Sequence, residues 1–250
     1  MKAKKVGIII QARMGSTRLP GKVLKLLDKD EKVLDVLIKR MKLCKKVDEI
    51  IIATTPDKQN SSIIDITKTH NVSYFIGSEE NVLERYYKGA KEHNLDIVIR
   101  ITSDCPFVDP KIVDDMINFY LHNNYDYINN IHETSNFSRG FDVEIFSFEV
   151  LENIYSLAKN KPEKEHVTYY IYNHPEDFNI FYYNLENLKR FDKLRLTIDE
   201  EEDLILCIEV FKKLKEKGKS FDFSLYDILE IIENNPELMN INKQIKQKNV

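Results

Sequence analysis

Cysteine is scarce in this chain of 250 residues, which contains only Cys44, Cys105 and Cys207. Their number is odd and they lie far apart, so the sequence predicts neither a disulfide framework nor a CxxC metal site. A chain without disulfides suits a reducing compartment. We therefore expect the protein in the cytoplasm.

Long apolar runs and a strong net charge are also missing. No apolar run approaches the roughly 18 residues that a membrane-spanning helix needs, and no signal-peptide pattern opens the chain. The net charge of −4 gives no overall attraction to nucleic acid. We expect one folded domain over residues 1–250, with neither a membrane nor a nucleic acid as partner.

Short β-branched runs alternate with helical stretches along most of the chain. The expected strands are KVGIII, EIIIATT, VSYFIG, DIVIRIT and, later, LRLTID, and the expected helices include VLDVLIKRMKLC, NVLERYYKGAKEH and EEDLILCIEVFKKLKEKG. Apolar strands of this kind are covered on both faces. The alternation predicts an α/β fold with a largely parallel sheet. After the amphipathic SLYDILEIIENN we expect a frayed polar tail.

The composition changes at about residues 125–190, where Asn, Tyr and Phe become frequent. We interpret this excursion as an antiparallel element that also contributes to substrate binding. Its stretch from Tyr169 to Tyr183 is too apolar for a lone exposed segment. We therefore expect this stretch to be buried in a two-fold homodimer.

The glycine signatures of the common nucleotide-binding loops are absent. A Walker loop needs four residues between its glycines and a Ser or Thr after its Lys, but five residues separate Gly15 from Gly21, and Val23 follows Lys22. The dinucleotide pattern fails as well, because no third glycine opens a helix.

A basic loop, QARMGSTRLPGK, instead follows the first expected strand. Open α/β sheets bind ligands at the carboxyl ends of their strands, which is where this loop lies. It supplies three cations, two glycines that allow close backbone approach and a hydroxyl donor: Arg13, Arg18, Lys22, Gly15, Gly21 and Ser16. We interpret it as a triphosphate site, and the alternative is a solvated surface loop.

Two stretches echo each other, RITSD at residues 100–104 and RLTID at residues 195–199. Each places an Asp four residues after an Arg, behind an apolar strand face. If both strands belong to one sheet, Asp104 and Asp199 meet in the crevice beside the basic loop. Two hard oxygen ligands there predict a magnesium site. The alternative is that each Asp caps a following helix.

Resemblance to a known family rests on IIIQARMGSTRLPGKVL, RYYKGAKEHNLDIVIRITSDCPFVDP, GFDVEIFS, EHVTYYI and LRLTIDEEEDL. In this order, over about residues 5–210, they resemble the cytidylyltransferase family of CMP-Kdo and CMP-acylneuraminate synthetases, and especially its spore-coat polysaccharide branch. The resemblance implies a Rossmann-like nucleotide-diphosphosugar transferase fold, with helices on both faces of the sheet and a small antiparallel dimerisation lobe. It also implies Mg²⁺-dependent attack of a sugar hydroxyl on the α-phosphate of CTP, which releases pyrophosphate.

By this resemblance the catalytic residues are Arg13, Lys22, Asp104 and Asp199, and the two aspartates bind the metal. The nucleotide-binding residues are Gln11, Ala12, Arg13, Gly15, Ser16, Arg18, Lys22, Thr54 and Arg85. For Arg85, on a helix face, a salt bridge is the alternative role. Many Kdo and sialate enzymes read PAR where this chain reads QAR, which leaves the sugar open.

The excursion is the expected place for the acceptor sugar. Polar residues in apolar company are typical of a carbohydrate pocket, and we assign to it Arg139, Asp142, Glu144, Glu165 and His166. Arg139 suits a sugar carboxylate or is a surface residue, and His166 has a cap or a dimer contact as its alternative role. The expected reaction joins CTP to a nonulosonic or Kdo-like sugar acid, giving a CMP-sugar for surface polysaccharide or glycan biosynthesis.

Three rival functions stay open. A sugar 1-phosphate would serve as acceptor in an enzyme that makes a nucleoside diphosphate sugar. A metal-dependent glycosyltransferase typically has an Asp-x-Asp pair, whereas TSDCP offers only Asp104. A non-catalytic nucleotide-binding protein would need neither both aspartates nor the complete basic loop.

Overall fold

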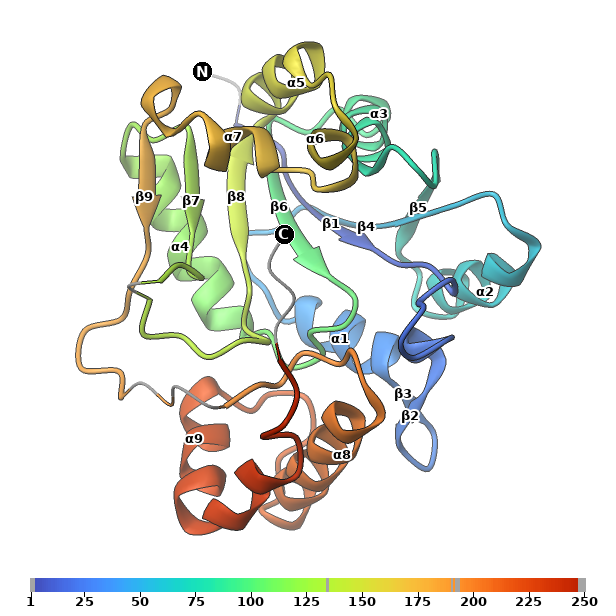
Figure 1. The fold of residues 1–250 in the computed structure, drawn as a ribbon, viewed down its shortest axis with the longest axis vertical. Helices are drawn as coiled ribbons and strands as arrows, with labels where there is room; N and C mark the ends of the chain where they lie inside the picture. The colour runs from blue at the N-terminus through green and yellow to red at the C-terminus, as the bar shows by residue number, and fades with distance from the viewer. Residues whose placement is uncertain (1–2, 134, 190, 192–193, 247–250) are drawn as a thin grey trace.

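A seven-stranded sheet in the order β5-β4-β1-β6-β8-β7-β9 forms the centre of the computed structural model (Figure 1), which describes residues 3–133, 135–189, 191 and 194–246. The strands are β1 Val6–Gln11, β4 Glu49–Thr54, β5 Ser73–Ile76, β6 Ile97–Thr102, β7 Tyr127–Asn129, β8 Glu144–Ser147 and β9 Ile180–Tyr182, with the separate pair β2 Leu26–Asp28 and β3 Glu31–Lys32. The helices are α1 Val33–Met41, α2 Ser61–Thr69, α3 Val82–Glu92, α4 Pro110–His122, α5 Phe148–Leu157, α6 Lys161–Glu165, α7 Tyr169–Asn173, α8 Glu201–Glu216 and α9 Leu225–Asn234, with short 3₁₀ turns at η1 Lys22–Leu24, η2 Lys58–Asn60, η3 Pro175–Asp177 and η4 Pro236–Asn240.

The parallel half of the sheet is built from β5, β4, β1 and β6, as the apolar runs predict. In β1, Ile8 and Ile10 join the core on one face while Ile9 joins the core on the other. The chain adds β4 and β5 on one side of β1 and then β6 on its other side. In open α/β sheets such a change of direction marks the ligand-binding region beyond the carboxyl ends of the strands, here β1 and β6. We call this region the crevice.

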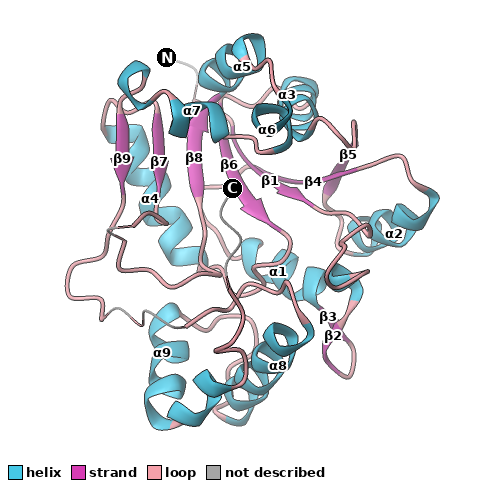
Figure 2. Cartoon of the chain, in the orientation of Figure 1, coloured by secondary structure: helices cyan, strands magenta, loops and turns pink. Residues whose placement is uncertain are grey.

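Helices cover both faces of the sheet (Figure 2). The core that contains Ile9 also takes in buried side chains of α3, α5 and α7. The core that contains Ile8 takes in those of α1, α2, α4, α8 and α9. Within the described part of the chain, no helix is both long and apolar enough to span a membrane.

Residues of the Asn- and Tyr-rich excursion extend this same sheet. Strand β8 pairs antiparallel with both β6 and β7, and β9 pairs parallel with β7 at the sheet edge. The expected antiparallel element is therefore present. A small antiparallel sheet of two strands, β2 and β3, lies much earlier in the chain.

The expected strand LRLTID is wrong. Its described residues make an isolated bridge to Arg139, and their backbone N–H groups donate to loops, from Leu196 to the Arg139 carbonyl at 2.8 Å and from Ile198 to the Asp104 carbonyl at 2.8 Å. Gly140 permits this approach, because it has φ +106° and a Cβ there would lie 2.5 Å from the Leu196 carbonyl carbon. The apolar alternation thus reflects packing between loops.

The expected frayed tail is also wrong as far as the structure describes it. After α9 the chain turns through η4, where Leu238 is buried. Asn242 is 2% exposed and lies against the segment that carries Asp199. The buried polar contacts of Asn242 explain why a polar sequence packs here.

Arg40, on α1, ties the C-terminal helices to the sheet. Its side chain is fully buried and its guanidinium lies 3.5 Å from the ring centre of Phe223. It donates to the backbone carbonyls of Phe107, Val108, Phe221 and Phe223. The loop after β6 and the segment before α9 are thereby fixed to one cation.

Candidate active site

Lys22 joins the two predicted carboxylates. Its Nζ lies 2.7 Å from Oδ2 of Asp104 and 2.9 Å from Oδ1 of Asp199. All three side chains are largely buried, with 12% of Lys22, 21% of Asp104 and 13% of Asp199 exposed. The echo in the sequence therefore placed both carboxylates beside the basic loop, although one of them does not follow a strand.

The backbone around the crevice positions this group. The basic loop folds back on itself, because the N–H groups of Ser16 and Gly21 both donate to the Met14 carbonyl at 2.9 and 3.0 Å. Gly21 has φ 66°, a left-handed conformation that glycine adopts without strain, and the chain then enters η1 with Lys22 as its first residue. Asp104 follows the last residue of β6 by two positions.

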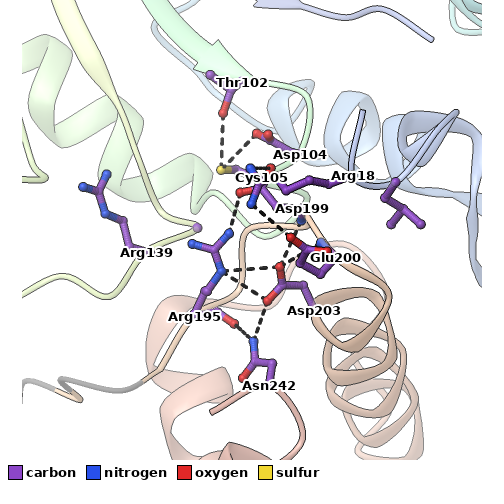
Figure 3. Close-up of polar contacts among 12 residues, drawn as sticks. Arg18, Thr102, Asp104, Cys105, Arg139, Arg195, Asp199, Glu200, Asp203 and Asn242 are labelled. Atoms are coloured by element: carbon purple, nitrogen blue, oxygen red, sulfur yellow. Dashed lines mark hydrogen bonds and ion pairs between the residues drawn. The ribbon is translucent and has the colours of Figure 1, made fainter. Parts of the chain in front are cut away.

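Cations surround Asp199 on several sides (Figure 3). Arg18 contacts its Oδ1 at 2.9 Å, and Arg195 donates to its Oδ2. Burial disfavours the charged carboxylate, but Lys22, Arg18 and Arg195 outweigh burial and hold the pKa of Asp199 below its ordinary value. Burial likewise opposes the charge of Lys22, while the two carboxylates raise the pKa of its ammonium. Asp199 and Lys22 are therefore charged at neutral pH.

Neither aspartate caps a helix. Asp109 is the N-cap of α4, and its side chain accepts from the Lys111 N–H. The N-cap of α8 is Glu200, paired in a capping box with Asp203. The capping alternative for Asp104 and Asp199 is therefore wrong, and both side chains are directed to Lys22.

The carboxylate pair fits a divalent cation. One ammonium contacts both groups, so an oxygen from each carboxylate converges on a single position of cationic size. Carboxylate oxygens are the ligands that Mg²⁺ prefers, and this ion keeps several waters when the protein provides few ligands. No group of three or more His, Cys, Asp or Glu side chains suited to a metal occurs among the described residues. Any ion held here would therefore complete its shell with phosphate or water oxygens.

The remaining loop residues lie around the crevice without joining the carboxylates. Gln11 accepts from Arg100 at 3.4 Å, and buried Ala12 donates to the Ala53 carbonyl at 3.0 Å. Arg13 is 44% exposed and contacts Glu79 at 3.3 Å. The predicted cationic trio is thus divided, because Arg18 and Lys22 contact the carboxylates whereas Arg13 contacts Glu79. Gly15 lies beside Glu79, and Ser16 accepts from the Leu19 N–H.

Thr54 and Arg85 are buried, and Arg85 lies close enough to Arg13 and Glu79 for their charges to act on it. The Oγ1 atom of Thr54, at the end of β4, and the Nε atom of Arg85 have no hydrogen-bond partner within the described residues. Nη1 of Arg85 donates to the Ser78 carbonyl at 2.6 Å, and burial lowers the pKa of its guanidinium. Arg85 makes no salt bridge with a described residue, so the salt-bridge alternative is wrong.

Glu144 forms the core of a buried polar network beside β6. It accepts from Arg100 at 2.5 Å and from the Thr168 hydroxyl at 2.8 Å. Burial opposes the Arg100 charge, but Glu144 raises the pKa of this guanidinium. Tyr172 also donates to Glu144, at 3.4 Å. Glu144 is therefore already engaged by protein groups.

The other predicted sugar residues form two pairs, Arg139 with Asp142 and Glu165 with His166. Arg139 contacts Asp142 at 3.1 Å, and the Gly140 N–H donates to Asp142 at 2.9 Å. Burial raises the pKa of Asp142, and Asp104 adds to this shift. Glu165 is exposed at the end of α6, whereas half-buried His166 follows it as the C-cap, and burial lowers the pKa of His166.

Sequence reasoning missed Arg195, Arg100 and Asp203. Both arginines lie four residues before the echoing aspartates, which was a usable signal, but only Arg195 contacts its Asp. Arg100 turns instead to Glu144 on the neighbouring strand. Asp203 looked like an ordinary first-turn helix residue. That pattern does not indicate that the Asp203 side chain is completely buried, with 0% of its surface exposed.

Comparison with known proteins shows which family this chain belongs to. A family model described as cytidylyltransferase matches residues 7–244. This chain belongs to the cytidylyltransferase family. The resemblance read from the sequence is thereby confirmed.

Relatives of this cytidylyltransferase extend over nearly its whole length. It is 39% identical to an uncharacterized protein of Methanocaldococcus jannaschii, over 96% of this chain and 95% of that protein. It is 36% identical to the spore coat polysaccharide biosynthesis protein SpsF of Bacillus subtilis, over 92% of this chain and 94% of that protein. The structure of a cytidylyltransferase from Leptospira borgpetersenii matches with a TM-score of 0.87 at 35% identity, covering 99% of this chain and 100% of that chain. The nucleotidyltransferase fold predicted from the sequence is confirmed.

Proposed function

We propose that this cytidylyltransferase transfers CMP from CTP to a sugar acid of the nonulosonic or Kdo-like type, with Mg²⁺ as cofactor and pyrophosphate as second product. The observation that carries the proposal is the contact of Lys22 with both Asp104, just after the carboxyl end of β6, and Asp199. This contact brings together two carboxylates that would bind the metal and a cation that would bind phosphate. The three free thiols suit a reducing cytoplasm as its compartment.

Electrostatic stabilisation is the main contribution of these residues. Negative charge grows on the phosphate oxygens as the sugar hydroxyl attacks the α-phosphorus and pyrophosphate leaves. Lys22 and Arg18 reach the carboxylates from the basic loop, so a short side-chain movement would bring them to the β- and γ-phosphates. Arg13, which is exposed and does not contact the carboxylates in the described structure, suits the α-phosphate. Cations held in place before the reaction stabilise this charge without reorganising.

Asp104 and Asp199 would hold Mg²⁺, which when bound neutralises phosphate charge and lowers the pKa of the attacking hydroxyl. The carboxylates also keep Lys22 and Arg18 oriented toward the crevice before CTP arrives. Gln11, Ala12, Gly15 and Ser16 would line the nucleotide from the loop backbone. Thr54 and Arg85, with buried polar atoms that lack described partners, suit hydrogen bonds to the base.

The acceptor would bind between β8 and the segments around residues 139–142 and 165–168. Arg139 is 47% exposed and is free to meet a sugar carboxylate once it leaves Asp142. Burial keeps His166 neutral, so its ring can donate to or accept from a sugar hydroxyl. We assign Glu144 an indirect part, because its oxygens already bind Arg100 and Thr168.

We also propose a homodimer formed through the edge of the excursion. Strand β9 has a single neighbour, β7, in the described sheet. Phe181 in β9 lies 4.6 Å from the ring of Phe119 and 4.9 Å from that of Tyr125, and all three are only partly buried. A second copy would cover this aromatic edge. Light scattering at micromolar concentration should give the mass of a dimer, and a monomer would contradict this part of the proposal.

A pyrophosphate-release screen tests the activity. Four nucleoside triphosphates are each combined with sugar acids and with sugar 1-phosphates, with Mg²⁺ or with EDTA. We expect release with CTP and a sugar acid, only with Mg²⁺. Release with a sugar 1-phosphate would favour the rival acceptor class. CTP binding without turnover on any acceptor would favour a non-catalytic protein, and loss of a nucleotide sugar without pyrophosphate would indicate glycosyl transfer.

A further inference from the structure

The two oxygens of the Asp199 carboxylate have different partners. Oδ1 is directed to Lys22 and Arg18, which belong to the basic loop. Oδ2 accepts from Arg195, which belongs to the same segment as Asp199. Arg195 therefore holds Oδ2 in place, while Oδ1 is directed to the basic loop and the crevice.

A second carboxylate, Asp203, fixes Arg195 in turn. Asp203 has no exposed surface, and Nε of Arg195 lies 3.2 Å from its Oδ1 and 3.4 Å from its Oδ2. Its Oδ2 also accepts from the backbone N–H groups of Asp199 at 3.0 Å and Glu200 at 3.1 Å. A helix capping box requires only the bond to Glu200. The bonds to Arg195 and to the Asp199 backbone hold the metal-binding residue by both its main chain and its side chain.

Asn242 closes this arrangement from the C-terminal segment (Figure 3). Its Nδ2 donates to Oδ1 of Asp203 at 2.8 Å and to the backbone carbonyl of Arg195 at 2.9 Å. The residue is 2% exposed. A side chain near the end of the chain thus contacts both members of the pair that holds Asp199.

The first carboxylate is held differently. Asp104 contacts Lys22 and, weakly, the Cys105 thiol at 3.6 Å. Arg100, the counterpart of Arg195, is engaged by Glu144. Among the contacts of the described residues, Asp199 has a buried supporting network and Asp104 does not.

We propose that Arg195, Asp203 and Asn242 are positioning residues that fix the orientation of Asp199 and thereby set the affinity of the site for a divalent cation. This inference rests on the proposed metal-binding role of Asp199. Groups that orient a metal ligand typically change metal affinity or activity by about 10–100-fold when they are replaced. They touch neither substrate nor metal in this proposal.

The test measures how strongly a metal promotes CTP binding. Calorimetry gives the dissociation constant of CTP in EDTA and that of Mn·CTP, and their ratio is the metal coupling of each variant. Asp203→Asn places an amide N–H against the Arg195 guanidinium or two backbone donors, so we expect its coupling to fall by about 10–100-fold. Arg195→Lys and Asn242→Ala should lower it as well, and Asp199→Asn should abolish it.

Asp227→Asn is the matched control. Asp227 is the capping-box carboxylate of α9, accepting from the Ser224 N–H at 2.7 Å, and it belongs to a different helix from Asp203. A variant that only weakens a helix cap should lower the melting temperature and leave the metal coupling of the folded protein unchanged. We expect this result for Asp227→Asn. For Asn242→Ala we expect the metal coupling to fall more clearly than the melting temperature.

Two failures are distinguishable. If the wild type shows no metal coupling, or Asp199→Asn keeps it, the proposed metal site itself is wrong. If the wild type and Asp199→Asn behave as proposed while Asp203→Asn and Asn242→Ala retain wild-type coupling, the positioning network is wrong. If Asp203→Asn does not fold, Asn242→Ala and Arg195→Lys decide by the same ratio.

Discussion

Replacing Lys22 by Met tests whether this ammonium neutralises the carboxylate pair. The change removes two charge-assisted hydrogen bonds, at 2.7 Å to Asp104 and 2.9 Å to Asp199, while an unbranched side chain of similar length remains. Such bonds contribute about 1.5–3 kcal/mol each. The carboxylates keep some contact with solvent, and Asp199 keeps Arg18 and Arg195. We therefore expect a loss of about 2–3 kcal/mol in the free energy of unfolding at pH 7.

The pH dependence of this loss has a definite sign. The pKa of Lys22 is raised, so its contribution to stability is complete below the ordinary value of 10.5 and is lost as the pH rises above it. The pKa of Asp199 is lowered, so its contribution is complete above the ordinary value of 3.8 and is lost as the pH falls. The difference between wild type and variant should be constant from about pH 5 to 9 and shrink below about pH 4.

Urea unfolding across this pH range is the assay, with Lys25→Met as the control. Lys25 is 41% exposed and lies 3.7 Å from Glu201, so its loss should change stability by less than about 1 kcal/mol. Divalent cations should stabilise Lys22→Met more than the wild type, because the carboxylates have lost their resident cation. If Lys22→Met and Lys25→Met unfold alike, the carboxylate pair does not depend on Lys22 and our reasoning is refuted.

Three further variants and one titration test the carboxylate pair, Arg40 and His166. Asp104→Asn and Asp199→Asn should each lower pyrophosphate release more than about 100-fold, since the proposed metal site loses a ligand. The amide oxygen of Asn can still accept from Lys22 without the help of a negative charge, so Asp104→Asn should melt below the wild type but above Lys22→Met. Near-normal rates in both variants at limiting Mg²⁺ would refute the site. Arg40→Met should destabilise the fold by about 3–5 kcal/mol in urea, because four backbone carbonyls lose a buried donor; a loss under about 1 kcal/mol would show that water replaces the guanidinium. Burial lowers the pKa of His166, so NMR titration of its ring should give a pKa below the ordinary 6.5, with the stability that depends on neutral His166 lost as the pH falls below that value; a pKa above 6.5 would place the ring in solvent or beside a carboxylate.

Much of the fold was predictable because its strands are buried on both faces. Ile8, Ile9 and Ile10 in β1 all have no exposed surface, so the run had to lie inside the sheet. The basic loop and Asp104 were then located by the general rule that ligands bind at carboxyl strand ends. These predictions needed only local patterns and one rule of topology.

The remainder depends on contacts between distant segments. RLTID alternates like a strand, yet its N–H groups meet loops because Gly140 lets two backbones approach. Asp203 and Asn242 lie 39 residues apart and read as a helix cap and a polar tail, and only their shared burial with Arg195 gives them a role. No local period encodes a bond of that kind.

The bonds of Lys22 also determine when the site can form during folding. They connect residues separated by 82 and 177 positions along the chain. The entropy of closing such loops is lost before the contacts compensate it, so contacts of this span form late. A growing chain that has not yet released α8 and α9 from the ribosome lacks Asp199 in place and has no complete crevice. If CTP binds at this site as we propose, its affinity should appear only after the last helices dock, and CTP binding would report complete folding rather than sheet formation.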